Sequence, residues 1–119
     1  MIKGIGIDMI EVSRVTDSIR KPGFREKIFT KAELEMLQER NNPQVYAGQF
    51  TAKEAVSKAL GTGIGKIKWT DIEVLRRNDG SPYVVLYNKA AEILGNGRVY
   101  ISITNLNEIA AAFALIEEG

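Results

Sequence analysis

Two carboxylates in this sequence stand where an acidic side chain is unusual. Asp8 closes a run of alternating isoleucine and glycine, and Glu54 lies among small and apolar residues in a stretch with helical periodicity. Two carboxylates from separate elements can bind Mg²⁺ and leave coordination positions open for water and substrate phosphates. The pair therefore suggests a magnesium site.

Both acids also fit purely structural roles. Asp8, with Glu11 three residues later, matches a helix capping box, and such a cap stabilises a helix by about 1 kcal/mol. Glu54 precedes Lys58 by four residues, the spacing of an ion pair that contributes about 0.2–0.5 kcal/mol on exposed helices. Lys53 fits a solvent-exposed neighbour of that pair. The sequence alone leaves these interpretations open.

Histidine and cysteine are both absent from the 119 residues. This absence excludes histidine-based triads, imidazole zinc sites, thiol nucleophiles and disulfides. A general base must be Asp, Glu, Lys, Tyr or water, and a catalytic metal must bind oxygen ligands, as Mg²⁺, Mn²⁺ and Ca²⁺ do. No apolar run approaches the ~20 residues that cross a bilayer, and the first residues lack a signal-peptide layout, so we expect a cytoplasmic protein.

A basic segment and a glycine-rich loop are the other candidate binding sites. Residues 14–31 carry six basic side chains against two acidic ones, although the net charge of the chain is only +1. With Phe24 among them, they would dock an acidic protein, bind a nucleic acid strand or form a solvated face, and nucleic acid is the weakest choice because aromatic residues are few. The loop Gly61-Thr62-Gly63-Ile64-Gly65 would either present backbone N–H groups to a phosphate or simply end the preceding helix.

The elements that must position these residues follow from apolar periodicity and turn residues. We expect a strand over residues 2–8 and helices from Asp8 to about Arg20, from Thr30 to about Arg40 and from about Pro43 to Leu60. The second half predicts strands over 72–75 and 83–87 joined by a tight turn, a helix over 88–94, a strand over 99–104 and an apolar run over 109–116. An α+β fold follows, with an antiparallel sheet and helices packed on one face, in a single domain over residues 1–119.

Several blocks of sequence occur in a recognisable order. They are Gly4-Ile5-Gly6-Ile7-Asp8, Phe50-Thr51-Ala52-Lys53-Glu54-Ala55-Val56-Ser57-Lys58-Ala59, Gly61-Thr62-Gly63-Ile64-Gly65, Asn78-Asp79-Gly80-Ser81-Pro82-Tyr83 and Ile101-Ser102-Ile103-Thr104. Together they resemble bacterial holo-[acyl-carrier-protein] synthases, the small class of 4′-phosphopantetheinyl transferases. The resemblance implies a Mg²⁺-dependent enzyme of fatty acid biosynthesis, in which a serine of an apo acyl carrier protein attacks the β-phosphate of coenzyme A. It also implies a cytoplasmic homotrimer with active sites between subunits, and no nucleic acid or membrane partner.

The resemblance implies a role for each candidate residue. Asp8 and Glu54 match the metal ligands, with Glu54 and Lys58 as the catalytic pair. Glu54 would take the serine proton, and Lys58 would neutralise charge on the pyrophosphate. The coenzyme would be lined by Lys58, Gly61, Thr62, Gly63 and Pro82. The carrier protein would bind the residues of the basic segment, namely Arg14, Arg20, Lys21, Phe24 and Arg25.

Two positions depart from the pattern of that family. Gln49 stands where the family usually has arginine, and Asn105 stands where it usually has histidine. The resemblance implies that both positions help to bind coenzyme A. The departures therefore favour an alternative, a catalytically weakened relative that holds a carrier protein or a nucleotide without turnover. Lys66 or Lys68 would be the compensating cations.

Overall fold

The structure, a computed structural model, describes residues 1–119. Its elements in chain order are β1 (Ile2–Glu11), α1 (Val12–Ile19), α2 (Phe24–Ile28), α3 (Lys31–Arg40), α4 (Pro43–Ala59), the 3₁₀ turn η1 (Trp69–Asp71), β2 (Ile72–Arg76), β3 (Pro82–Leu86), α5 (Asn88–Leu94), β4 (Arg98–Asn105) and β5 (Ile109–Glu117). The strands form two antiparallel sheets, ordered β1-β5-β4 and β2-β3. The predicted α+β class is confirmed, with the strands divided between two sheets. None of the helices combines the length and apolarity of a membrane span.

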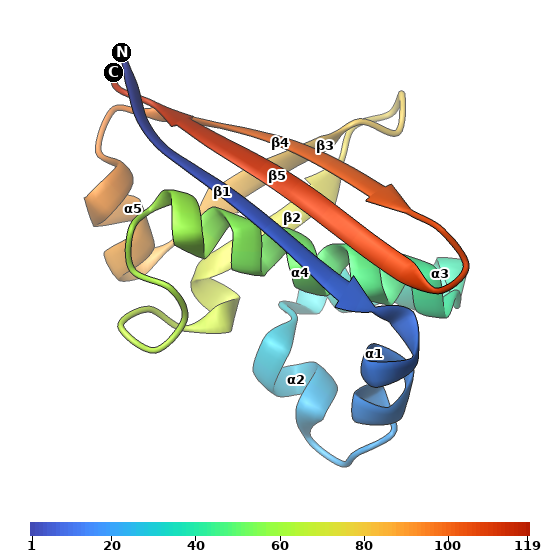
Figure 1. The fold of residues 1–119 in the computed structure, drawn as a ribbon. Coiled ribbons are helices and arrows are strands. Elements are labelled where there is room, and N and C mark those ends of the chain that lie inside the picture. The colour runs from blue at the N-terminus through green and yellow to red at the C-terminus, as the bar shows by residue number, and fades with distance from the viewer.

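Helix α4 is the longest helix and lies beneath the three-stranded sheet (Figure 1). Asn42 caps its first turn by accepting a hydrogen bond from the backbone N–H of Gln44, and Pro43 occupies the first helical position. Gly61, at φ +83°, lets the chain turn away after the last helical residues. Ala52, Ala55, Val56 and Ala59 of this helix are buried in the main core.

Strand β1 lies closer to α4 than ordinary side chains would permit. A Cβ added to Gly6 would overlap the carbonyl oxygen of Ala55, and one added to Gly4 would overlap that of Ala59. Glycine is therefore required at both positions for the backbones to approach. Side chains alternate along a strand, so residue 8 is the next position on this face. The two glycines thus bring Asp8 against the helix.

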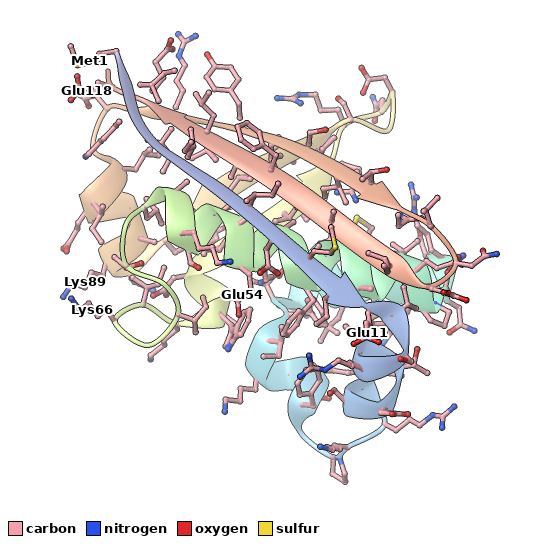
Figure 2. The ribbon with its side chains drawn as sticks, viewed as in Figure 1. Met1, Glu11, Glu54, Lys66, Lys89 and Glu118 are labelled. Atoms are coloured by element: carbon pink, nitrogen blue, oxygen red, sulfur yellow. The ribbon has the colours of Figure 1, made fainter.

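Strand β1 is also longer than predicted, and the capping box assigned to Asp8 is wrong. The strand continues through Asp8 to Glu11, in antiparallel register with β5 up to the pair Glu11↔Ile109. Helix α1 therefore begins at Val12, and no side chain caps it. Residues 9–11 gain a complete ladder with an apolar partner strand, which outweighs the local preference for a cap. The two chain ends meet at the opposite end of the β1–β5 ladder, where the N–H of Glu118 donates to the carbonyl of Met1 (Figure 2).

Helix α3 was predicted from the sequence, whereas helix α2 was not. The helix start predicted at Thr30 is confirmed and has a capping box, in which the Thr30 hydroxyl accepts from the N–H of Glu33 and the carboxylate of Glu33 accepts from the N–H of Thr30. Helix α2 was not predicted, because five residues are too few to show a helical period.

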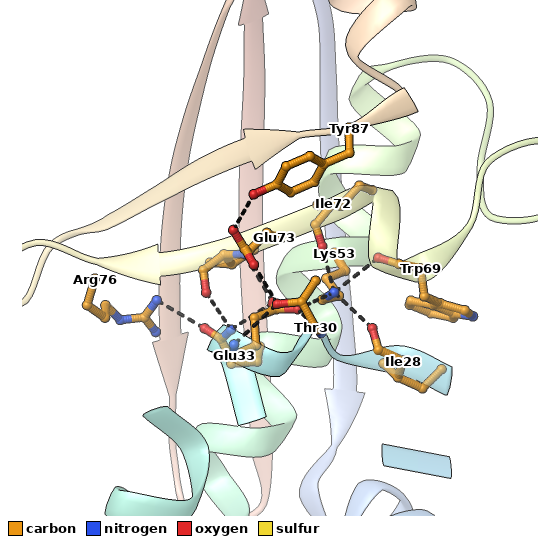
Figure 3. Close-up of polar contacts among 11 residues, drawn as sticks. Ile28, Thr30, Glu33, Lys53, Trp69, Ile72, Glu73, Arg76 and Tyr87 are labelled. Atoms are coloured by element: carbon orange, nitrogen blue, oxygen red, sulfur yellow. Dashed lines mark hydrogen bonds and ion pairs between the residues drawn. The ribbon is translucent and has the colours of Figure 1, made fainter. Parts of the chain in front are cut away.

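A buried ion pair joins α4 to α3 and the smaller sheet (Figure 3). Lys53 Nζ lies 2.6 Å from Glu33 Oε1, and neither side chain is exposed. The same ammonium donates to the carbonyl oxygens of Ile28, Trp69 and Ile72. Burial raises the pKa of Glu33 and lowers the pKa of Lys53, while their mutual attraction opposes both shifts. Lys53 is therefore a structural anchor, and its interpretation as an exposed neighbour of Glu54 was wrong.

Replacing Lys53 by methionine should destabilise the protein strongly, because Glu33 would keep a buried charge with no cationic partner. Breaking one side of a buried pair costs about 3–5 kcal/mol. Urea denaturation measures this loss, with the exposed Lys27→Met as the control that removes the same charge from α2. Equal free energies of unfolding in the two variants would show that the ion pair does not anchor the helix.

Candidate active site

Asp8 and Glu54 line the same pocket, of about 330 Å³, beside the second half of β1. The remaining lining residues come from β1, α1, α2 and α4: Met9, Ile10, Arg14, Val15, Ser18, Phe24 and Phe50. Figure 2 shows Glu54 on the side of α4 where α1 and α2 lie. The fold thus brings the two carboxylates to one place, together with Arg14 and Phe24 of the basic segment.

Both oxygens of the Asp8 carboxylate accept hydrogen bonds from α4. Thr51 Oγ1 donates to Oδ2 at 2.6 Å, and Lys58 Nζ lies 3.1 Å from Oδ1. Lys58 also donates to the carbonyl of Ile7. The structure has two ion pairs, Lys53–Glu33 and Lys58–Asp8, so the simple helical pair of Glu54 with Lys58 is not formed. Lys58 instead links the helix to the strand.

Glu54 has a perturbed acidity. Burial raises the pKa of Glu54, the negative charge of Asp8 raises it further, and the positive charge of Lys58 opposes both effects. A carboxyl group with a raised pKa is a stronger proton acceptor once it is ionised. The pocket thus carries the two carboxylates of Asp8 and Glu54 and the guanidinium of Arg14, and Lys58 forms an ion pair with Asp8.

The donor set fits Mg²⁺. The pocket offers two carboxylates, and no cluster of three or more acidic side chains forms elsewhere in the structure. Mg²⁺ is usually held by one or two carboxylates and completes its shell with water and substrate phosphates. Asp8 and Glu54 are therefore sufficient protein ligands for this ion.

The glycine-rich loop owes its conformation to the end of α4. Gly61 and Gly63 both have positive φ, which only glycine adopts without strain. The N–H of Gly61 donates to the carbonyl of Lys58, and those of Thr62 and Gly63 donate to the carbonyl of Ser57. These N–H groups close the helix and are not free to cradle a phosphate. The helix-stop interpretation of the loop therefore accounts for its backbone.

Pro82 lies far from that loop within one copy of the chain. It opens β3 opposite Arg76, next to the turn of the β2–β3 hairpin. Figure 1 shows this turn and the loop after α4 at opposite ends of the molecule. Within a single protomer the structure thus separates Pro82 from the other predicted coenzyme-lining residues, Lys58 and Gly61–Gly63.

The predicted carrier-binding residues have different surroundings. Arg14 and Phe24 line the pocket, while Arg20 and Lys21 are exposed in the connection between α1 and α2. Arg25 is turned toward the protein, because its Nε donates to the carbonyl of Ile19 and its guanidinium lies 5.3 Å from the centre of the Tyr46 ring. Arg14 and Phe24 are therefore the residues of this set nearest the two carboxylates.

Gln49, one of the two departures from the family pattern, is fully buried. Its amide nitrogen donates to Glu33 and to the carbonyl of Val74, and its amide oxygen accepts from Arg76 Nη1 at 3.0 Å. Figure 3 shows Arg76 beside this network. The cation in contact with position 49 is therefore Arg76, while Lys66 and Lys68, suggested by the sequence as compensating cations for coenzyme binding, are exposed.

Thr51 is a residue of the site that sequence analysis missed. It lies three residues before Glu54 and seven before Lys58, which places all three on one stripe of α4. A polar residue on that stripe was the available signal. Because a hydroxyl carries no charge, this signal was weaker than that of Glu54 or Lys58.

Comparison with known proteins identifies the family of the chain. A family model of the 4′-phosphopantetheinyl transferase superfamily matches residues 4–114. The chain is 46% identical to the holo-[acyl-carrier-protein] synthase of Fusobacterium nucleatum, over 98% of this chain and 99% of that protein. It is 47% identical to the synthase of Alkaliphilus metalliredigens, over 97% and 98% of the two chains.

Solved structures give the same result. The crystal structure of a holo-(acyl-carrier-protein) synthase from Bacillus anthracis in complex with coenzyme A (3′,5′-ADP) matches with a TM-score of 0.87 and 36% identity, over 100% of this chain and 99% of that one. The Helicobacter pylori synthase in complex with coenzyme A matches with a TM-score of 0.85 and 27% identity, over 95% and 99%. These matches favour an enzyme over the alternative of a binding module. The chain belongs to the 4′-phosphopantetheinyl transferase superfamily, within its holo-[acyl-carrier-protein] synthase family of transferases.

Proposed function

We propose that this chain transfers 4′-phosphopantetheine from coenzyme A to a serine of an apo acyl carrier protein, in a Mg²⁺-dependent reaction that serves fatty acid biosynthesis in the cytoplasm. The observation that carries the proposal is the pocket shared by Asp8 and Glu54, with Arg14 and Phe24 at its edge. The coenzyme complexes of the Bacillus anthracis and Helicobacter pylori relatives support coenzyme A as the donor.

Asp8 and Glu54 would hold the magnesium ion. When bound, Mg²⁺ supplies positive charge that stabilises the phosphate oxygens in the transition state. Asp8 is suited to this role because β1 and α4 fix it from both sides, and its side chain is still 18% exposed. A carboxylate has about four lone pairs, so the bonds from Thr51 and Lys58 leave two for a metal.

Lys58 is the second source of positive charge. Its side chain is 49% exposed and reaches Asp8 and the carbonyl of Ile7 from the open side of the pocket. An ammonium on a flexible stem can leave this partner for a phosphate oxygen at little cost, because it is already hydrated. Lys58 would neutralise charge on the pyrophosphate as the bond to the leaving group breaks.

Glu54 would take the proton of the attacking serine, directly or through a water molecule. The serine oxygen forms the new bond to the β-phosphorus, and the bond to the bridging oxygen breaks, releasing adenosine 3′,5′-bisphosphate. The raised pKa of Glu54 suits this task, since a base is most effective when its pKa is nearer the working pH.

The carrier protein would approach across the basic segment. Arg14 lies at the pocket, and Arg20 and Lys21 extend the positive charge along the α1–α2 connection. Phe24 stacks on Phe50, with ring centroids 6.3 Å apart, and supplies an apolar contact beside these charges. Such a surface suits an acidic partner, with charge guiding the encounter and the aromatic ring fixing the docked position.

Copies of the chain would assemble into a homotrimer with active sites between subunits. We call the face of the larger sheet turned away from α4 the outer face. It exposes the large apolar residues Ile5, Ile7, Met9, Tyr100 and Phe113. Exposed apolar patches of this kind mark interaction sites. The separation of Pro82 from Gly61–Gly63 in one copy also supports a coenzyme site built from two. Residues 1–119 would form one transferase domain in each subunit.

Replacing Glu54 by glutamine should abolish transfer and leave the fold intact, because the amide keeps the shape of the side chain and cannot accept a proton. General base catalysis is typically worth about 10²–10⁴-fold, and losing a metal ligand adds to that. Mass spectrometry of an apo carrier incubated with coenzyme A and Mg²⁺ measures the transfer. Glu92→Gln, which makes the same change on the exposed face of α5, is the control. Turnover near normal in Glu54→Gln would remove Glu54 from both proposed roles.

Replacing Ile7 by lysine should break the trimer, because Ile7 lies in the outer face and is 65% exposed in the isolated chain. Light scattering should give three times the chain mass of 13.2 kDa for the unmodified protein and the single-chain mass for the variant. Ala32→Lys, which places the same charge on exposed α3, is the control. An unmodified protein with the mass of one chain would refute the trimer.

A further inference from the structure

Thr51 makes a contact that its position in a helix does not explain. Hydroxyl groups within helices commonly donate to a carbonyl of the preceding turn. Thr16, Ser18 and Ser57 all do so, bonding to the carbonyls of Val12, Arg14 and Glu54. Thr51 instead donates across to another element, the Asp8 carboxylate of β1.

The geometry of this contact is that of a strong hydrogen bond. Thr51 Oγ1 lies 2.6 Å from Asp8 Oδ2, within the range of a hydroxyl donating to an ionised carboxylate. Thr51 has no solvent exposure, so its side chain is held by the surrounding core. The branched Cβ restricts χ1 further. The hydroxyl is therefore a fixed donor.

The second donor to Asp8 has the opposite character. Lys58 Nζ lies at 3.1 Å from Oδ1, and its side chain is about half exposed on a long flexible stem. A lysine that moves toward a substrate phosphate weakens or gives up its bond to the carboxylate. Asp8 then retains Thr51 as its one side-chain donor from α4.

We propose that Thr51 is a positioning residue that fixes the orientation of the Asp8 carboxylate for the divalent cation and thereby frees Lys58 for the pyrophosphate. This inference rests on the proposed metal site at Asp8 and Glu54. Thr51 does not touch the cation. It acts as the outer partner that orients a metal ligand, and loss of such partners typically weakens metal affinity or activity by about 10–100-fold.

The test measures metal binding without turnover. Mn²⁺ is titrated into the full-length protein with saturating coenzyme A and no carrier protein, and free Mn²⁺ is followed by electron paramagnetic resonance. Thr51→Val removes the hydroxyl and keeps the branched shape, so Mn²⁺ should bind about 10-fold more weakly. Thr51→Ser keeps the hydroxyl and should bind nearly as well as the unmodified protein. Thr16→Val, whose hydroxyl bonds only to its own helix, should leave binding unchanged.

The outcomes separate the two proposals. Thr51→Val with unchanged Mn²⁺ affinity would overturn the role of Thr51, and so would equal weakening in Thr51→Val and Thr51→Ser, because packing rather than the hydroxyl would then be responsible. Thermal unfolding of the metal-free proteins checks that each variant is folded. An unmodified protein that binds no Mn²⁺ would instead overturn the metal site itself.

Discussion

The close contact between β1 and α4 is the constraint on which the rest of the site depends. Gly4 and Gly6 leave no side chain between the two backbones, and the carbonyl oxygens of the helix occupy the space where Cβ atoms would be. Asp8 is the next residue on that face after the two glycines, and its side chain contacts the helix. The carboxylate therefore meets the Thr51–Lys58 stripe of α4, and Asp8 and Glu54 line one pocket although they lie far apart in the sequence.

Helix α4 has a different electrostatic role on each side. Toward β1 it presents Glu54, which lines the pocket, and the half-exposed Lys58, which forms an ion pair with Asp8. Toward α3 and the smaller sheet it buries Lys53, whose ammonium binds a carboxylate and three backbone carbonyls. The buried charge fixes the helix against its neighbours, so the charges of Glu54 and Lys58 are held in defined positions. Phosphoryl transfer depends mainly on such placement and on charge neutralisation. The chain has no histidine or cysteine, and the polar groups gathered at this site are carboxylates, an ammonium and a hydroxyl.

Elements with many residues of regular apolar periodicity, or with strong turn residues, could be predicted from the sequence. The helix over Pro43–Ala59 and the hairpin around Asn78-Asp79-Gly80 are examples, because their signals are local. Asp8 matches a helix cap by its local signal alone. It instead joins a ladder with β5, where its partner Ala112 lies more than a hundred positions later in the chain. The burial of Lys53 could not be predicted for a related reason. Its partner Glu33 and its carbonyl acceptors belong to other elements, so the spacing of residues along the helix does not reveal them. The approach of Asp8 to Glu54 was inferred from a family resemblance, since periodicity alone cannot show which elements touch.

The central claim is that Asp8 and Glu54 hold one divalent cation. Anomalous diffraction from crystals grown with Mn²⁺ and coenzyme A tests it most directly, because the manganese signal locates the ion independently of the protein atoms. The account predicts one peak per active site, within coordination distance of an oxygen of Asp8 and an oxygen of Glu54. A peak bound by other residues, or a structure in which these two carboxylates share no ion even between subunits, would contradict it.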